Sequence, residues 1–265
     1  METIFLELPA PLEILTDPII LIIYAIYGIL FLWETFFPAR QLPKIRYWKL
    51  RGFVFFVVFL LMTTYLPLLW DGFFSSYQLI DLSGLPLFAQ MILGIVLVEF
   101  VQYVWHFSMH KSDLLFRVSH QIHHSSERID TPSAFIFSLN DMIGLALVGS
   151  VSFALIMGLA PQAITYIILT TMFLGIFQHA NIKTPRWLGY IIQRPESHSL
   201  HHGMGIHQYN YSDLPLIDIL FGTFRNPESF QDQTGYYLGA SNRLIDMLRF
   251  KDVTQIKGVS NDTKK

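Results

Sequence analysis

The sequence predicts an all-α integral membrane protein with about five transmembrane helices, and two observations carry that prediction. Of the 265 residues, 52% are hydrophobic and 14% are charged, and the mean hydropathy of +0.42 lies on the apolar side of a soluble domain. The apolar residues also form long uncharged runs without the period-two alternation of barrel strands. Because backbone groups in lipid must be satisfied internally, such runs predict helices.

Five segments reach the length of about 20 residues that an apolar helix needs to cross hydrocarbon. The first covers 18–33 and extends through TFFPA, the second covers 52–70, and the third covers 82–98 and continues as EFVQYVWH. Residues 142–178 hold no charge, which is too long for one crossing. This run predicts two helices with a tight turn at 158–161, Gly-Leu-Ala-Pro.

The distribution of basic residues predicts the orientation. The loop between the first two helices is basic, whereas residues 1–39 and 71–81 contain no Lys or Arg. Positive loops stay in the cytoplasm, so we expect the N-terminus outside, and the segment between helices three and four and everything after 178 inside. A bacterial inner membrane and an endoplasmic reticulum both fit. The basic residues are Arg40, Lys44, Arg46, Lys49 and Arg51.

Charge and cysteine content exclude several classes of protein. The net charge is −2 without a basic run, which argues against a nucleic-acid partner. The absence of cysteine excludes disulfides, thiolate metal sites and a cysteine nucleophile. The N-terminal segment is acidic, so no cleaved signal peptide is predicted.

All ten histidines lie in the two predicted cytoplasmic segments or at the helix ends next to them, and eight form three boxes. The spacing i, i+4 in the first box places two imidazoles on one helix face. The second and third boxes share the spacing i, i+3, i+4, and we expect each triplet to present one cluster. The boxes are His106 and His110; His120, His123 and His124; and His198, His201 and His202.

These eight histidines, with His179, exceed what one metal ion can bind, so two ions are predicted. Imidazole ligands suit iron, zinc, copper and nickel, and a redox-active metal would make a lipid-facing site chemically useful. Histidine-rich tracts also bind adventitious metal or sense pH, but three spaced boxes on one membrane side favour a built site.

The order and spacing of motifs between 95 and 227 resemble the fatty acid hydroxylase/sterol desaturase superfamily. The resemblance implies a non-haem di-iron membrane enzyme that uses O2 to hydroxylate or desaturate a lipid such as a fatty acyl chain or sterol. Electrons would come from NAD(P)H through a separate partner such as cytochrome b5 or a ferredoxin and its reductase. The motifs are Glu99-x3-Tyr103-x-Trp105-His106-x3-His110, Leu114-Leu115-Phe116-Arg117-x2-His120-x2-His123-His124, His179-x-Asn181, His198-x2-His201-His202, Asn210-Tyr211 and Asp218-x2-Phe221-Gly222.

The resemblance also implies roles for single residues, with no catalytic residue separate from the metal ligands. The eight box histidines and His179 would divide between the two irons, and His207 is a candidate tenth ligand. Asn181 or Asn210 would alternatively reach a metal through water. The side chains expected to accept the second imidazole N–H groups are Glu99, Asp213, Asp218 and Asn181.

Three parts of the chain are predicted: transmembrane helices in 1–94, the hydroxylase-like domain in 95–227, and a cytoplasmic tail in 228–265 that ends in a frayed KGVSNDTKK. Residues 185–195 are expected as a helix on the membrane surface. Asp141 is expected to cap the fourth transmembrane helix.

Two other functional classes remain open at this point. A zinc-dependent membrane hydrolase would need a general base, and no box contains the Glu of an HExxH motif. A non-catalytic lipid-binding membrane protein would not need all eight box histidines. The sequence does not decide between hydroxylation and desaturation.

Overall fold

The computed structural model describes residues 8–255, and five long helices form its body. Each is long and apolar enough to cross a membrane, which confirms the predicted multi-pass protein. The expected polar end KGVSNDTKK lies outside the described residues. The five are α2 (Pro18–Phe36), α3 (Trp48–Ser75), α4 (Leu87–Lys111), α7 (Leu139–Ser150) continued by the π-helix η3 (Val151–Ile156), and α8 (Pro161–His179).

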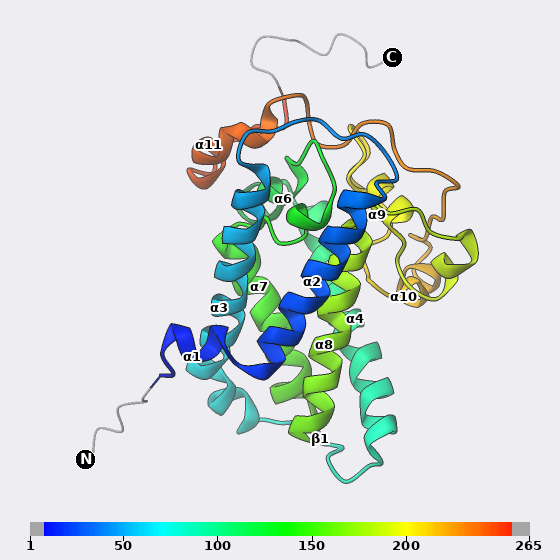
Figure 1. Cartoon of the computed structure of the whole chain (residues 1–265). Helices are drawn as coiled ribbons and strands as arrows, with labels where there is room; N and C mark the ends of the chain where they lie inside the picture. The colour runs from blue at the N-terminus through cyan, green and yellow to red at the C-terminus, as the bar shows by residue number, and fades with distance from the viewer. Residues whose placement is uncertain (1–7, 256–265) are drawn as a thin grey trace.

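Shorter elements lie at the two ends of this bundle (Figure 1). Helix α1 (Pro11–Leu15) and the two-residue strand β1 (Ile80–Asp81) lie at one end, where β1 pairs in parallel with β2 (Met157–Gly158) at the predicted turn between η3 and α8. The strand pair was not predicted. The opposite end carries a cap of α5 (Asp113–Leu115), η1 (Phe116–His120), α6 (Gln121–His124), η2 (Thr131–Ser133), η4 (Arg186–Tyr190), α9 (Pro195–His201), α10 (Pro215–Leu220), η5 (Ala240–Arg243) and α11 (Leu244–Leu248).

The segment 185–195 differs from the expected surface helix. It forms a single 3-10 turn, η4, and α9 then begins at Pro195, since proline is favoured in the first turn of a helix. Trp187 and Tyr190 are nevertheless exposed, as a segment against the membrane surface requires.

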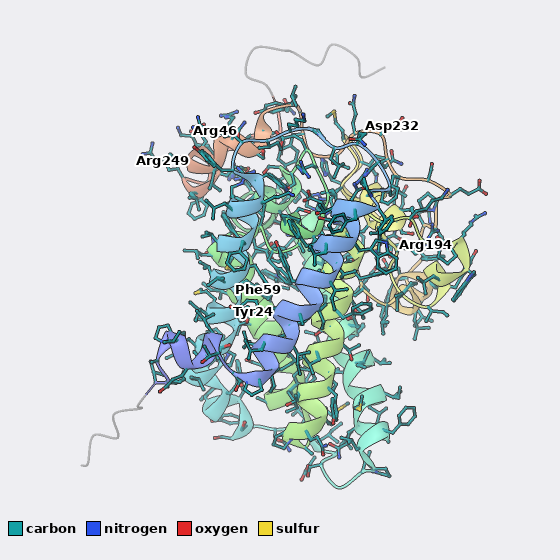
Figure 2. All side chains as sticks on the ribbon, in the orientation of Figure 1. Tyr24, Arg46, Phe59, Arg194, Asp232 and Arg249 are labelled. Atoms are coloured by element: carbon teal, nitrogen blue, oxygen red, sulfur yellow. The ribbon has the colours of Figure 1, made fainter. Side chains whose placement is uncertain are left out.

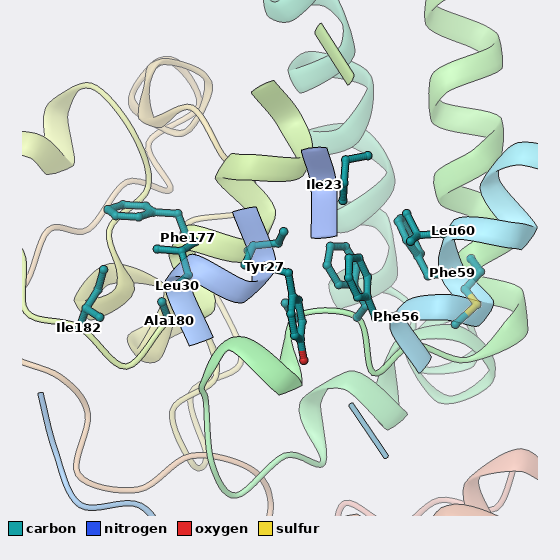
Figure 3. Close-up of a cluster of buried hydrophobic side chains, with 13 residues drawn as sticks. Ile23, Tyr27, Leu30, Phe56, Phe59, Leu60, Phe177, Ala180 and Ile182 are labelled. Atoms are coloured by element: carbon teal, nitrogen blue, oxygen red, sulfur yellow. The ribbon is translucent and has the colours of Figure 1, made fainter. Parts of the chain in front are cut away.

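An aromatic core joins the first two long helices to the loop that follows the second histidine box. The rings of Tyr27 on α2 and Phe56 on α3 stack with centroids 4.6 Å apart (Figure 3), and Phe56 stacks on Phe135 at 4.8 Å. Figure 2 shows Tyr24 and Phe59 midway along the bundle and Arg46, Arg249 and Asp232 at the cap end. The apolar middle and the charged cap are consistent with a membrane-embedded bundle.

A buried carboxylate on α2 ties this helix to the cap. Glu34 Oε2 on α2 accepts hydrogen bonds from the backbone N–H and hydroxyl of Thr131 and from the backbone N–H of Asn181, each at 2.9 Å. Thr131 follows the second box, and Asn181 lies two residues after His179. Glu34 therefore holds two histidine-bearing segments in a fixed position relative to the bundle.

Helix α3 approaches this region closely at one glycine. A Cβ on Gly52 would overlap the carbonyl oxygen of Pro132, whereas a Cβ on Gly72 of the same helix would meet open space. We predict that Gly52→Ala lowers the free energy of unfolding by about 1–3 kcal/mol, because α3 must move away from η2. The unfolding temperature in detergent measures this effect.

Gly72→Ala is the matched control, because it adds the same methyl group to the same helix. Alanine has the higher helix propensity, so this variant keeps or raises the unfolding temperature. Equal unfolding temperatures for the two variants would contradict the close contact between α3 and η2.

Candidate metal centre

Nine histidines converge into two adjacent groups at the cap end of the bundle. The ligand atoms in each group lie within 4.8 Å of one another, and eight of the nine residues are buried. These are the nine histidines predicted to divide between two metals. The five-histidine group contains His106, His110, His120, His124 and His201, and the four-histidine group contains His123, His179, His198 and His202.

The structure divides each triplet box between the two groups, whereas one cluster per triplet was expected. His120 and His124 belong to one group and His123 to the other. On a helix, residue i+4 lies about 40° ahead of residue i and residue i+3 about 60° behind it, so the two differ by about 100°. The spacing i, i+3, i+4 therefore suits a helix between two ions, and the third box repeats the arrangement with His201 apart from His198 and His202.

Local structure brings the boxes together. His106 and His110 occupy the last turns of α4, and His179 ends α8. The second box begins at the last residue of the π-helix η1 and continues into α6. Single π-turns of this kind occur frequently at functional sites because they redirect side chains.

The spacing of the ring nitrogens fits metal ligation. Nε2 of His179 lies 3.2 Å from Nε2 of His123 and 3.0 Å from Nε2 of His198. Two nitrogens bound about 2.1 Å from one ion lie about 3.0 Å apart at right angles and about 3.4 Å apart at tetrahedral angles. Nε2 of His110, His124 and His201 is buried without a hydrogen-bond partner in the described residues. The donor set therefore fits two ions with imidazole ligands.

Acceptors on the outer side of the five-histidine group fix the imidazole tautomers. Nδ1–H of His106 donates to the carbonyl of Tyr211 and Nδ1–H of His201 to the carbonyl of Tyr209, both at 2.7 Å. Nδ1–H of His120 donates to Oδ2 of Asp141 at 2.6 Å. Because Nδ1 carries the proton in each of these bonds, Nε2 of the ring is unprotonated, and its lone pair can bind a metal ion at the centre of the group.

Asp141 is the functional residue that sequence reasoning assigned to another role. Ser138 caps α7, and its hydroxyl accepts from the backbone N–H of Asp141. The carboxylate of Asp141 is fully buried and faces His120 instead. The sequence did offer one indication of this role, because Asp141 directly precedes a run of 37 uncharged residues, where an acidic side chain is unusual.

The four side chains expected to accept imidazole N–H groups bond elsewhere in the described part of the chain. Glu99 Oε2 accepts from the Ser212 hydroxyl and the backbone N–H groups of Asp213 and Leu214. Asp218 accepts from the backbone N–H groups of Tyr211 and Ser212. These two carboxylates therefore hold the strand of backbone whose Tyr211 carbonyl bonds His106. Asp213 accepts from Gln178, and Asn181 donates to the carbonyl of Arg40.

Asn210 and His207 lie next to the site but outside both groups. The Asn210 amide donates to the carbonyls of Ser197 and Arg225 and accepts from the Arg225 N–H, so it serves as a structural bridge. Nδ1 of His207 lies 2.9 Å from Nδ1 of His124, on the outer side of that ring. His207, Tyr209 and Asn210 all adopt positive φ, the backbone form that places the Tyr209 carbonyl at His201.

Burial keeps the imidazoles of the cap neutral. Desolvation lowers the pKa of five box histidines well below its ordinary value, and neighbouring imidazoles lower it further. Desolvation also lowers the pKa of the His207 imidazole to about 4. It shifts the nearby Asp213 carboxyl in the other direction and raises its pKa to about 6. Neutral imidazoles are the form that binds metal. The five are His123, His124, His198, His201 and His202.

Two adjacent cavities that share lining residues reach the histidines. A small one of about 40 Å³ lies against both groups, and a large, mostly apolar one of about 950 Å³ extends through the bundle to the end that carries β1. The larger volume is typical of a site for a small organic ligand. The walls shared by the two cavities are Gln102, Phe137, Leu145, Gln178, His179 and Asp213.

Comparison with known proteins finds a family and curated relatives that resemble this chain. Residues 91–223, about half of the chain, match the fatty acid hydroxylase family. Ornithine lipid hydroxylase OlsE of Rhizobium tropici is 30% identical over 146 residues, which cover 54% of this chain and 44% of that protein. The chain thus spans less than half the length of this curated relative. No solved structure matches the chain significantly.

We predict that Asp141→Asn weakens metal binding by about 10–100-fold, because the neutral amide no longer fixes the tautomer and charge of His120. Competition with a soluble chelator measures the affinity. Asp81→Asn is the control, since Asp81 is an exposed carboxylate at the opposite end of the bundle. Equal metal retention in both variants would rule out this role for Asp141.

The metal-free protein should lose stability in acid. The unfolded chain binds protons at its histidines below about pH 6.5, whereas the folded histidines stay neutral to a lower pH. Stability therefore falls as the pH drops below about 6.5. Asp130, Asp213 and Asp218 act in the opposite sense, because burial raises their pKa on folding, but they are three groups against six histidines. We expect the unfolding temperature of the metal-free protein to be lower by about 5 °C or more at pH 5 than at pH 7.5. The same unfolding temperature at both pH values would contradict the presence of buried neutral histidines.

Proposed function

Because this chain belongs to the fatty acid hydroxylase/sterol desaturase superfamily, we propose that it is a membrane-bound non-haem di-iron oxidoreductase that hydroxylates a lipid. The observation that carries the proposal is a large apolar cavity that reaches His179 of the four-histidine group and adjoins a small cavity lined by histidines of both groups. The similarity to an ornithine lipid hydroxylase favours hydroxylation over desaturation.

The proposed reaction converts C–H, O2, two electrons and two protons into C–OH and water. Two iron ions held by the five-histidine and four-histidine groups would supply the activation of O2. The electrons derive from NAD(P)H and arrive through a separate partner such as cytochrome b5 or a ferredoxin with its reductase.

The chain itself positions the ligands and the substrate. Asp141 and the carbonyls of Tyr209 and Tyr211 hold three imidazoles in the tautomer that directs Nε2 inward. The Phe137 ring lies 4.5 Å from the His123 ring and lines both cavities, so it limits how a substrate chain approaches the four-histidine group. The apolar walls exclude water from the reacting carbon.

We place the histidines on the cytoplasmic side and the N-terminus outside, in a bacterial inner membrane or an endoplasmic reticulum. The basic loop 37–47 lies at the cap end, where Arg40 donates to the carbonyl of Gln231. The positive-inside rule favours the cytoplasm for such a loop. Soluble or membrane-attached electron carriers would reach the cap from that side.

Lipid extracts from cells that express the protein test this function. We predict a species heavier by one oxygen, which carries the label when the cells grow under ¹⁸O2. His123→Ala lowers its amount by about 100-fold or more, because the four-histidine group loses a ligand. Asp81→Asn at the far end serves as the control.

Three results would contradict the proposal. They are lipid profiles that do not change with the intact protein, oxygen that comes from water, and turnover without O2 by protein that contains zinc. The last of these would indicate a zinc-dependent hydrolase.

A further inference from the structure

The charged side chains that line the two cavities are all acidic. Among the described residues, six carboxyl groups and no Lys or Arg line these walls. Apart from the metal ions proposed at the histidines, an anionic headgroup would meet only like charge there, which is unfavourable in a low-dielectric interior. The six are Glu13, Asp17, Asp71, Glu99, Asp141 and Asp213.

Three of these acids lie towards the histidines: Asp141 lines the small cavity, Asp213 lines both cavities, and Glu99 lines the large cavity and accepts a hydrogen bond from the Asp213 backbone. Glu99, Asp141 and Asp213 are 1%, 0% and 8% exposed. With the amides of Gln102 and Gln178, which line both cavities, they form what we name the carboxyl chamber. A buried carboxylate is costly unless it is paired, yet neither Glu99 nor Asp213 forms an ion pair in the part of the chain that the structure describes.

Each of these carboxylates leaves one oxygen available. All hydrogen bonds to Glu99 use Oε2, and Asp213 accepts from Gln178 through Oδ1. Oδ1 of Asp141 is fully buried without a partner in the described residues, although its Oδ2 bonds His120. Bound metal ions would offset charge on Asp141 through His120, but Glu99 and Asp213 form no hydrogen bond to a ligand histidine.

We propose that the carboxyl chamber binds the ammonium group of an aminolipid, whose hydrocarbon tail occupies the large apolar cavity. This inference rests on the proposed function, because it names the substrate class of the same site. An ammonium donates three hydrogen bonds and supplies the missing positive charge. The hydroxylated carbon then lies near the amine, because the chamber borders both histidine groups.

The acids at the far end of the large cavity are less suited to this role. Glu13 accepts from the backbone N–H of Ala10 and Asp17 from that of Ile19, so both carboxylates stabilise their own helix starts. Asp71 is partly exposed and has a free oxygen. It therefore marks the alternative position for an ammonium group.

A pair of probes with the same tail tests the proposal. N-palmitoyl-1,4-diaminobutane carries an ammonium group, and its N′-acetyl derivative is neutral. Their binding to the purified, metal-loaded full chain in a neutral detergent is measured by titration calorimetry without O2 or reductant. We expect the ammonium probe to bind about tenfold more tightly, and N-acetyl-1,4-diaminobutane, which lacks the tail, to bind far more weakly than either.

Isosteric variants locate the ammonium group. Asp213→Asn and Glu99→Gln should each remove most of the preference for the ammonium probe, whereas Asp71→Asn should retain it. The unfolding temperature and the metal content of each variant show whether it is folded and loaded. If Asp213→Asn fails to fold, Glu99→Gln and the probe pair on the unchanged protein still decide the outcome.

Equal affinity of the unchanged protein for the two long-chain probes would overturn the proposal. A preference that is lost in Asp71→Asn and kept in both chamber variants would overturn it as well, by placing the headgroup at the far end. Tight binding of the tail-less amine would show a general cation site instead. Because binding is measured without turnover, a protein that prefers the ammonium probe but never oxygenates lipid would refute the proposed function alone.

Discussion

The convergence of nine neutral imidazoles on two adjacent points determines the rest of this structure. One nitrogen of each ring must face the metal position. The other nitrogen is then left in a buried interior, where a polar atom without a hydrogen-bond partner costs free energy. The fold meets this requirement with acceptors on the outer side of several rings: the Asp141 carboxylate and the carbonyls of Gly175, Tyr209 and Tyr211. The backbone that supplies the Tyr211 carbonyl is in turn held by Glu99 and Asp218.

Much of the fold and the histidines of the candidate metal centre could be predicted from the sequence. Uncharged runs of the length of a bilayer identify the five candidate spans. Eight histidines of the two groups were recognised by their spacing, and His179 by its position at the end of the fifth span. Helix periodicity also indicates that each triplet serves two ions, because residues i+3 and i+4 point about 100° apart around the helix. This signal was overlooked, since the three residues of each triplet were expected to form one cluster. The partner of His123 could not be predicted from one helix, because it depends on where α8 places His179.

The acceptors of the imidazole N–H groups were harder to predict, for a physical reason. A backbone carbonyl such as that of Tyr209 has no side-chain signature, and its position depends on three residues with positive φ. Carboxylates near the histidines were natural candidates, yet Glu99 and Asp218 act one step further out, on backbone N–H groups. The acidic lining of the cavities likewise emerges only in three dimensions, since Glu99, Asp141 and Asp213 come from distant parts of the chain.

Neighbouring residues on one short helix, His123 and His124, are proposed to bind two different ions, and iron content combined with Mössbauer spectroscopy distinguishes the two sites. We expect two irons per chain in the unchanged protein. His123→Ala and His124→Ala should each lose mainly one iron, and the iron that remains should differ in spectrum between the two variants, because one keeps the five-histidine environment and the other the four-histidine environment. A single iron in the unchanged protein, or the same residual spectrum in both variants, would contradict the account.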